Sequence, residues 1–335
     1  MISPLIFYDS KTSAETDWEC GMKYWWQKYH GGGGIVPVEE ASYFLAGRQL
    51  HEDMEPFAKG VSVETACDLI LPLPTDATQV QLEQWSRRKG WVTAWGLYIE
   101  PYLRAFGDEV LCEDELLLCR DPLRVRTRPD RVQRRRGGGL VYREWKTTAS
   151  TRREWCEGWR YSIQLHIGLA ALGEASGEKA EYGQVTGLYK GTEKDGRLVH
   201  PYVWAYFKDG EWSHEWKRGW DHRPVWEYEG GYIDWVTRCG KETADKMFVW
   251  SPPVGLDTRI IDRYVTRRIE RLREVATVKD ACQTDIKLRE EHFEMRFSKC
   301  RPPYGEPCQY LAACHNASVN ANPVESGLYI PRGEH

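Results

Sequence analysis

Two acidic residues and one lysine flank a glycine-rich turn near the middle of the chain. Asp130 precedes the basic stretch "RVQRRRGGG" (131–139), and "LVYREWKTT" (140–148) then places Glu144 and Lys146 two residues apart. Two extended runs around a glycine-rich turn predict a β-hairpin. Because opposing residues of an antiparallel pair keep a constant index sum, we expect Asp130 opposite Glu144, or one residue out of register.

The expected hairpin would carry a cation site on one face. Side chains alternate along a strand, so Glu144 and Lys146 share a face while Trp145 points toward the core. Opposed carboxylates repel unless a positive charge lies between them, and carboxylate oxygens with water suit Mg²⁺ or Mn²⁺. Lys146 would then orient a water or stabilise negative charge on a phosphate. The alternative is an ion-pair ladder on an exposed sheet face, because acid-x-Lys alone is common; Asp130 and the adjoining arginines favour the metal site.

Composition sets the class of protein. The chain has 335 residues, 41% of them hydrophobic and 29% charged, which is typical of a globular protein. Apolar runs stay well short of the ~18 residues that span a bilayer, and the first 20 residues lack the features of a signal peptide. We therefore expect a cytoplasmic location and no membrane contact.

The net charge is −4, but seven arginines fall between Arg124 and Arg136, and such a local basic patch indicates a nucleic-acid partner.

Hydrophobic periodicity predicts the elements that position these residues. Apolar residues at helical spacing after the "GGGG" joint (31–34) predict a helix that carries His51. The elements expected next are a mostly helical stretch, a strand, the hairpin, a helix and two strands (72–106, 109–119, 124–148, 152–172, 183–191 and 199–208). This order predicts an α/β core. Charged helices are expected over 257–299, ahead of a cluster of cysteines.

Cysteine and tryptophan are unusually frequent. Cytosolic thiols stay reduced, so the ten cysteines predict metal ligation or ordinary burial rather than a disulfide framework. Most of the 16 tryptophans are expected in the core. Those of "WKRGWDHRPVWEYEGGYIDW" (216–235) have an alternative role as platforms on which nucleic-acid bases stack.

The acidic residues and the lysine resemble the signature of the PD-(D/E)XK nuclease superfamily, with "RPD" (128–130) followed by "EWK" (144–146). The similarity is greatest to the RecB-type branch, which includes AddB-like and CRISPR-associated exonuclease-like proteins. "GRQLH" (47–51) is similar to a pattern of glycine and histidine that precedes the core there. The resemblance implies a restriction-endonuclease-like α/β fold, a mixed sheet flanked by helices. It also implies that His51 and the backbone carbonyl of Trp145 join the two acids as metal ligands.

The same family has a helix after the lysine with a glutamine and often a tyrosine four residues later. "YSIQLHIG" (161–168) supplies Gln164, but Gly168 stands where the tyrosine is expected, and Tyr161 lies one turn earlier on about the same face. The resemblance implies that Gln164 helps to position Lys146 or the DNA strand, with Tyr161 as the candidate for the tyrosine. A polar helix face without a role in chemistry is the alternative.

Four cysteines bracket the nuclease-like residues. Iron–sulfur members of this branch have one cysteine before the core and three near the C-terminus, a layout matched by Cys20, Cys300, Cys308 and Cys314. Four thiolates are the usual complement of a 4Fe–4S cluster, whereas structural zinc sites usually contain a C-x₂₋₄-C pair, which this sequence lacks. The gap between Cys300 and Cys308 is longer than is common in the family, so zinc or a metal-free site remains an alternative. The other six cysteines are assigned to packing.

The resemblance implies one nuclease domain over residues 1–335. Its core would cover about 36–210 with a helical insertion at about 60–106, followed by a Trp-rich segment (211–256). The C-terminal helices and cysteines (257–335) would close onto Cys20 through a structural cluster.

The implied function is that of a Mg²⁺- or Mn²⁺-dependent deoxyribonuclease, and more narrowly an exonuclease of recombination, repair or phage DNA processing. Lys146 would assist the attacking water, while Arg126, Arg128 and Arg131 would grip the DNA backbone. A bacterial or phage-infected cell and a helicase or recombinase partner are implied as well. Two alternatives remain, a nucleic-acid-binding scaffold without catalysis and a zinc-stabilised interaction protein.

Overall fold

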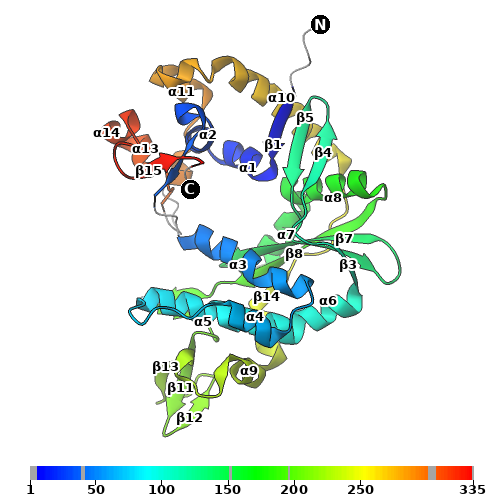
Figure 1. Ribbon diagram of the computed structural model, residues 1–335, viewed down its shortest axis with the longest axis vertical. Helices are drawn as coiled ribbons and strands as arrows, with labels where there is room; N and C mark the ends of the chain where they lie inside the picture. The colour runs from blue at the N-terminus through cyan, green and yellow to red at the C-terminus, as the bar shows by residue number, and fades with distance from the viewer. Residues whose placement is uncertain (1–5, 39–41, 151–152, 195–196, 301–306, 334–335) are drawn as a thin grey trace. The chain divides into compact units, whose positions relative to one another are not determined.

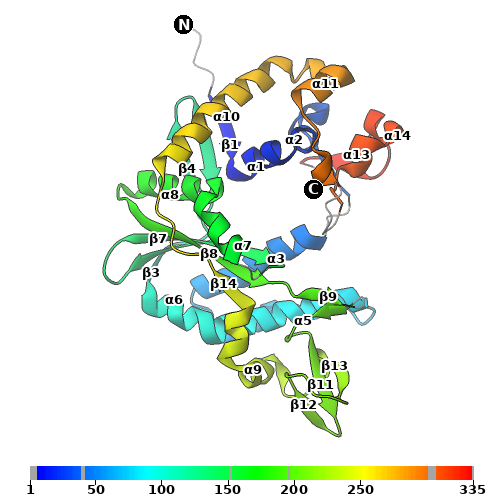
Figure 2. The ribbon, with the colours of Figure 1, turned by 180° about the vertical axis from the view of Figure 1, so that it is seen from behind.

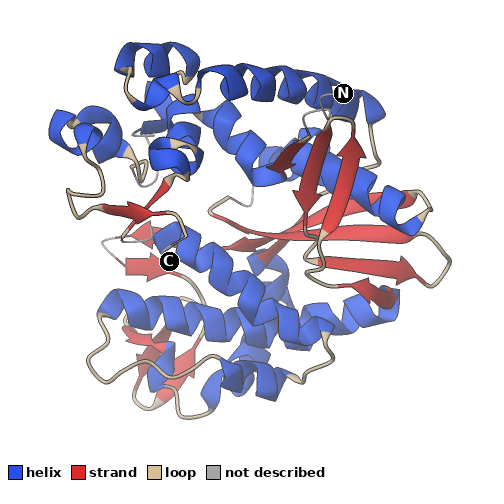
Figure 3. Ribbon diagram, turned by 45° about the horizontal axis from the view of Figure 1, so that its top comes forward, coloured by secondary structure: helices blue, strands red, loops and turns tan. Residues whose placement is uncertain are grey.

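The computed structural model describes residues 6–38, 42–150, 153–194, 197–300 and 307–333. The chain divides into two compact units, each built from segments that are distant in sequence. Unit 1 comprises Met1–Leu45, Leu116–Thr127 and Asp257–His335, and unit 2 comprises Ala46–Glu115 and Arg128–Leu256. Each unit combines helices with β-sheet (Figure 3). Among the described residues, no helix has both the length and the hydropathy needed to cross a bilayer.

Unit 2 is organised around a mixed five-stranded sheet in the order β14-β8-β7-β6-β3 (Figure 1). Its strands are β3 (Gly107–Leu111), β6 (Arg131–Arg135), β7 (Leu140–Thr148), β8 (Ala180–Tyr189) and β14 (Phe248–Trp250). β7 pairs antiparallel with β6 and parallel with β8. A parallel pair requires a long crossover, and α7 (Arg153–Gly158) and α8 (Ile163–Ser176) provide it. The expected mixed sheet flanked by helices is therefore confirmed.

Helices cover both faces of this sheet. On one face, α8 packs against β7 and β8 and ends at Gly177, which adopts the left-handed conformation with φ 70°. On the other face, α5 (Gln79–Ala94) begins with a capping box between Thr78 and Gln81. It continues through a π-helical turn (Trp95–Ile99) into α6 (Glu100–Phe106). α3 (Ser42–Ala58) carries His51, as expected, and buries Leu50, Met54 and Phe57 in the core.

The remaining elements of unit 2 lie outside the five-stranded sheet. They are α4 (Val63–Leu69), β9 (Thr192–Lys194), β10 (Arg197–Val199), β11 (Trp204–Lys208), β12 (Glu211–Ser213), β13 (Asp221–Pro224), a 3-10 turn (Val225–Glu227) and α9 (Gly231–Met247). β11 is the middle strand of a three-stranded sheet with β12 and β13. Trp91, Trp95, Trp145 and Trp235 lie in the core of the unit, so for these residues the expectation of buried tryptophans is confirmed.

Four expectations for the strands and helices are wrong in detail. The strand expected over 199–208 is interrupted at 200–203, so that it corresponds to the end of β10 and to β11. The run 109–119 is not one strand, because a turn at 112–115 separates β3 from β4 (Leu116–Arg120). The run before the hairpin turn is also divided: β5 (Leu123–Thr127) pairs with β4 in unit 1, and only β6 pairs with β7. The helix over 152–172 is interrupted by a 3-10 turn (Trp159–Tyr161), after which Ser162 is extended with ψ 119°.

Unit 1 contains both ends of the described chain (Figure 2). Its first part has β1 (Phe7–Ser10), α1 (Lys11–Glu19), α2 (Gly21–Lys28), a 3-10 turn (His30–Gly32) and β2 (Ile35–Pro37). Its last part has α10 (Thr258–Val278), a 3-10 turn (Ala281–Gln283), α11 (Ile286–His292), α12 (Phe297–Cys300), α13 (Leu311–His315), α14 (Ala317–Ala321) and β15 (Tyr329–Pro331). The expected charged helices at 257–299 are thus confirmed. Pairing of β1 with β5 and of β15 with β2 joins the segments.

Candidate active site

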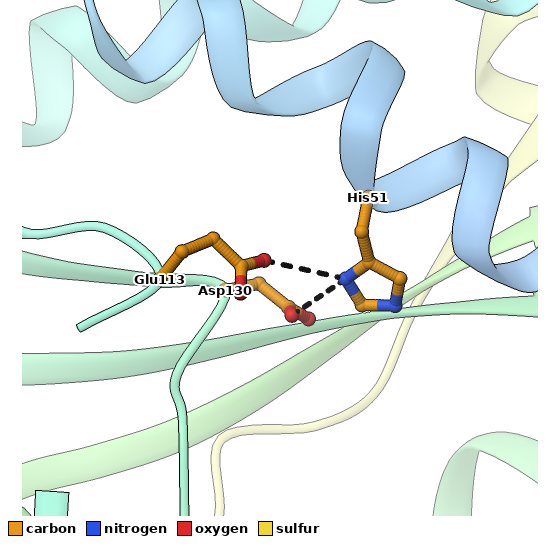
Figure 4. A group of neighbouring side chains, drawn as sticks. All are labelled: His51, Glu113 and Asp130. Atoms are coloured by element: carbon orange, nitrogen blue, oxygen red, sulfur yellow. Dashed lines mark ion pairs between the residues drawn. The ribbon is translucent and has the colours of Figure 1, made fainter. Parts of the chain in front are cut away.

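A histidine and two acidic residues meet at the edge of the unit 2 sheet (Figure 4). His51 projects from α3, Asp130 directly precedes β6, and Glu113 lies in the turn after β3. The Nδ1 atom of His51 is 2.8 Å from Oδ1 of Asp130 and 3.5 Å from Oε1 of Glu113. Ligand atoms of the three residues all lie within 4.8 Å of one another, which is close enough to bind one cation.

Glu113 is the ligand candidate that the sequence did not suggest. It has a left-handed backbone with φ 56°, a conformation that is costly for a residue with a Cβ. The turn is held by the N–H of Glu113, which donates to the carbonyl of Pro129 at 3.0 Å, and by the N–H of Cys112, which donates to Asp114 Oδ2 at 3.2 Å. The acidic triplet "EDE" (113–115) in an otherwise apolar run was the signal for a turn.

Glu144 lies on β7, beside Lys146 and Tyr142. Their side chains share one face of the strand: Tyr142 donates from Oη to Glu144 Oε1 at 2.6 Å, and Lys146 Nζ donates to Oε2 at 2.9 Å. Glu144 is only 1% exposed, so these donors stabilise a carboxylate that is otherwise shielded from water. The tyrosine holds the carboxylate in place, and the lysine supplies a nearby positive charge.

The register of the hairpin agrees with the expectation from the sequence. Arg131 pairs with Arg143 and Val132 with Tyr142, so the index sum is 274 and Asp130 continues the series opposite Glu144. The N–H of Trp145 donates to Asp130 Oδ2, which links the two strand ends. The indole of Trp145 points to the opposite face, into the core, as predicted, with its ring centroid 5.2 Å from that of Trp95.

Electrostatics make this a site for a cation. Burial raises the pKa of Asp130, and the charge of Glu144 raises it further, while His51 and Lys146 oppose the increase. Burial alone would lower the pKa of His51, but its hydrogen bonds with Asp130 and Glu113 outweigh burial and raise that pKa to about 9. A proton on His51 therefore supplies positive charge where the carboxylates converge. A divalent ion would supply it more strongly, and carboxylate oxygens with one imidazole are a suitable ligand set for Mg²⁺ or Mn²⁺.

Tyr142 occupies the space next to Gly168. A Cβ added to Gly168 would lie 2.2 Å from Cζ and 2.5 Å from Oη of Tyr142, so the glycine makes room for the phenol. The space that a side chain at position 168 would occupy is thus filled by the Tyr142 phenol of β7. Gln164 is half-buried in the first turn of α8, and Tyr161 is 73% exposed in the preceding 3-10 turn. Their expected roles stay predictions.

The arginines near Asp130 differ in their availability to DNA. Arg131 is buried and paired with Glu100, at 2.7 Å, and with Glu109. The prediction that Arg131 grips DNA is therefore wrong, because its guanidinium is already neutralised inside the protein. Arg126 and Arg128 are exposed. Three other arginines of the stretch also pair with acids: Arg124 with Asp121, Arg134 with Glu178 and Arg135 with Glu181.

A second candidate centre, the four-cysteine site, lies in unit 1 and comprises Cys20, Cys300, Cys308 and Cys314. None of the four is in a disulfide. The N–H of Cys308 donates to the carbonyl of Cys300 at 2.9 Å. Burial raises the pKa of the Cys300 thiol, and the neighbouring thiols of Cys20 and Cys308 raise it further. Burial likewise raises the pKa of Cys314 to about 12, with smaller increases from the other three thiols. The four thiols therefore lie near enough to one another to influence each other's pKa.

The other six cysteines divide by burial. Cys67, Cys239 and Cys282 are buried, as expected for packing, and the thiol of Cys67 lies 3.1 Å from Thr93 Oγ1. Cys112 and Cys156 are partly exposed. Cys119 is exposed on β4, so its assignment to packing is wrong.

The fold and site define a class of protein: an α/β protein in which carboxylates and a lysine of a mixed sheet and its adjoining turn meet a histidine from a neighbouring helix, a donor set suited to a divalent metal. The model of the PD-(D/E)XK nuclease superfamily matches residues 10–315, and the chain belongs to this superfamily. The fold is consistent with the restriction-endonuclease-like architecture, and membership implies a metal-dependent nuclease that acts on DNA. No curated protein matches the sequence.

Proposed function

We propose that the protein is a Mg²⁺- or Mn²⁺-dependent DNA exonuclease of the RecB-type branch, with a structural 4Fe–4S cluster. The observation that supports the nuclease most directly is the convergence of His51, Glu113 and Asp130 within 4.8 Å, with the Glu144–Lys146 pair opposite Asp130 in the hairpin. Exonuclease activity and the branch rest on the similarity of "GRQLH" (47–51) and of the cysteine layout to that branch.

The metal would be held by Asp130, Glu144, His51 and the backbone carbonyl of Trp145, with Glu113 as a further ligand. When bound, it would polarise the scissile phosphate and lower the pKa of a water. The protein supplies the positioning. The N–H of Trp145 fixes one oxygen of Asp130 and leaves the other toward His51.

Lys146 would act on the reacting groups themselves. Its ammonium is kept near Glu144 by the 2.9 Å hydrogen bond and remains partly exposed, so it can reach a water or a phosphate oxygen. There it would stabilise the negative charge that develops as the water attacks. Arg126 and Arg128 would contact phosphates of the DNA backbone, and Gln164 and Tyr161 would contact the strand near Lys146.

The four-cysteine site fits a cluster by the chemistry of its donors, since four thiols without disulfides are a soft ligand set for iron or zinc. Cys20 and Cys314 lie at opposite ends of the sequence but in the same unit. A metal centre here would close a very long loop, which contributes roughly several kcal/mol by restricting the unfolded chain. Cys308→Ala should therefore lower the thermal stability of the whole protein rather than only slow the reaction.

The test is digestion of end-labelled linear and covalently closed circular DNA by protein purified without air. We expect release of label from linear DNA with Mg²⁺ or Mn²⁺, no cleavage after metal removal by a chelator, and resistance of the circular substrate. Cleavage of the circular DNA would show that the protein is an endonuclease and not an exonuclease. Binding without cleavage would favour the inactive scaffold, and zinc instead of iron in metal analysis would contradict the cluster. Faster digestion in the presence of a helicase or recombinase would support such a partner.

A further inference from the structure

Arg289 is a buried arginine whose guanidinium forms no ion pair within the described part of the chain, although the Glu290 carboxylate acts on it electrostatically. It lies on α11 and is 3% exposed. Its Nη2 donates to Asn320 Oδ1 at 2.8 Å, while Nε has no hydrogen-bond partner and no acid among the described residues forms an ion pair with the guanidinium. Arg268 in the same unit is different, because Asp9 and Asp17 both contact it at 2.6 Å. A buried charge needs compensation, so the groups around Arg289 must supply it.

That environment leads to the four-cysteine site. The guanidinium carbon of Arg289 lies 5.1 Å from the ring centroid of Trp26 and 5.9 Å from that of Trp25. Trp26 in turn donates from Nε1 to the sulfur of Cys314 at 3.2 Å. Burial lowers the pKa of Arg289, while the neighbouring Glu290 carboxylate and then the thiols of Cys282 and Cys314 act in the opposite direction. The cation, the indole and one thiol ligand are therefore consecutive neighbours.

A metal centre at this site would leave negative charge inside the protein. Four thiolates exceed the charge of Zn²⁺, or of an oxidised 4Fe–4S core, by two units. Either metal would therefore give a dianion that is partly buried, since Cys20 and Cys300 are buried and Cys308 and Cys314 are partly exposed. Such an anion is stabilised by N–H donors and by nearby positive charge. Solvent cannot supply that charge at a buried thiol such as Cys20 or Cys300.

We propose that Arg289 is the internal counter-cation of the metal centre formed by Cys20, Cys300, Cys308 and Cys314, and that Trp26 connects the two. The proposal rests on the metal centre of the proposed function but not on the identity of the metal. It makes Arg289 a positioning residue for a thiolate centre: it stabilises the anion without touching the metal.

The test compares variants of the full chain purified without air. Arg289→Met removes the charge and keeps an apolar side chain against Trp26, Arg289→Lys keeps the charge, and Arg273→Met is the control at an exposed arginine of α10. The rate of metal release to a coloured chelator is measured. We expect release about 10- to 100-fold faster in Arg289→Met, near the wild-type rate in Arg289→Lys, and unchanged in the control. Trp26→Phe loses the N–H donor, and its rate of metal release should lie between those of the wild type and Arg289→Met.

A second measurement separates charge from packing. If the metal is iron, titration with dithionite gives the midpoint potential for one-electron reduction, which adds a further negative charge to the cluster. Loss of the cation should lower this potential by about 59 mV for each tenfold decrease in the equilibrium constant for one-electron reduction of the cluster. Arg289→Gln, which keeps a partner for Asn320, replaces the Met variant if circular dichroism shows that the latter is unfolded.

The outcomes distinguish the counter-cation proposal from the proposed metal centre on which it rests. A wild-type protein without metal would overturn both the centre and its counter-cation. A loaded wild type whose folded Arg289→Met or Arg289→Gln variant keeps the same release rate and, with iron, the same potential would overturn the counter-cation alone. Metal release as fast in Arg289→Lys as in Arg289→Met would also contradict the proposal, because the effect would then follow from packing and not from charge.

Discussion

The Nδ1 atom of His51 lies 2.8 Å from Oδ1 of Asp130, although one residue is on a helix and the other precedes a strand. The other oxygen of Asp130 accepts the N–H of Trp145, so both oxygens of this buried carboxylate have fixed partners. One oxygen therefore anchors the ligand to the sheet, and the other faces the place where the imidazole, Glu113 and a cation would meet.

Asp130→Asn should remove most nuclease activity and leave the fold intact. The amide has the same shape and its oxygen can still accept the N–H of Trp145, but the charge that binds a metal is lost. Because metal stabilisation of the transition state is worth several kcal/mol, we expect a loss in kcat of about 100-fold or more. Digestion of labelled DNA at saturating Mn²⁺ measures it, with Asp108→Asn on the exposed face of β3 as the control. Undiminished cleavage would remove Asp130 from the site.

Glu113→Gln tests the ligand that only the structure suggests. The turn is kept, because the backbone N–H of residue 113 makes the hydrogen bond to Pro129. The side-chain amide, however, is a weaker metal ligand than the carboxylate. We expect the Mn²⁺ concentration for half-maximal cleavage to rise about 10-fold while kcat at saturating Mn²⁺ changes little. Glu115→Gln, at an exposed position of the same turn, should behave as wild type. An unchanged metal requirement would leave Glu113 with a structural role only.

How far the sequence predicts the site can be judged from particular residues. The register of Asp130 and Glu144, and the inward direction of Trp145, follow from a local glycine turn and from strand alternation, so both were predictable. Glu113 was missed because an apolar run on both sides concealed the turn. The burial of Arg131 was missed because its partners Glu100 and Glu109 come from other elements, and sequence alone does not distinguish a paired arginine from a free one.

The same distinction holds for the fold. Local signals predicted the α/β class, the helix that carries His51 and the charged helices at 257–299. The division into two units was not predicted, because it depends on β5 leaving the hairpin to pair with β1 and β4 in another sheet. Strand pairing between distant segments is a tertiary property that periodicity does not encode.

Tyr142→Phe should weaken metal binding without removing any ligand. The phenol donates to Glu144 at 2.6 Å, and partners of this kind typically contribute 10- to 100-fold to metal affinity. Calorimetric titration with Mn²⁺ measures the change. Gly168→Ala should act in the same direction, since its Cβ would collide with the Tyr142 ring, and should also lower the melting temperature. Gly158→Ala, where a Cβ meets nothing within 4 Å, is the control. Equal affinity in the Phe variant would mean that Glu144 is positioned without Tyr142.

Lys146→Met should separate binding from chemistry. The methionine keeps the length of the side chain but removes the charge that stabilises the developing phosphate charge, so kcat should fall about 100- to 1,000-fold. DNA affinity, measured by fluorescence anisotropy in Ca²⁺ to prevent cleavage, should change less than threefold, roughly the contribution of one exposed charge. Lys146→Arg should recover part of the rate. A variant that cleaves normally, or that loses binding in proportion to activity, would contradict the assignment.

His200 should make unit 2 sensitive to acid. It is 2% exposed, accepts the N–H of Tyr202 at Nδ1 and donates from Nε2 to the carbonyl of Tyr189, so the geometry holds the neutral ring. Burial lowers the pKa of His200 to about 3, with a further contribution from the Arg87 guanidinium, against about 6.5 in the unfolded chain. Below pH 6.5 the unfolded state therefore binds a proton that the folded state does not. Stability present above that pH should be lost as the pH falls toward 3, by up to about 1.4 kcal/mol per unit.

His200→Gln cannot take up this proton, so its urea midpoint should depend less on pH than that of the wild type between pH 7 and 4.5. The amide can donate and accept like the neutral imidazole, although it is smaller than the ring against Trp91 and Tyr202, so some stability is lost at every pH. The informative quantity is therefore the slope of the unfolding free energy against pH, not its value. Parallel slopes for His200→Gln and the wild type would show that His200 does not titrate on unfolding.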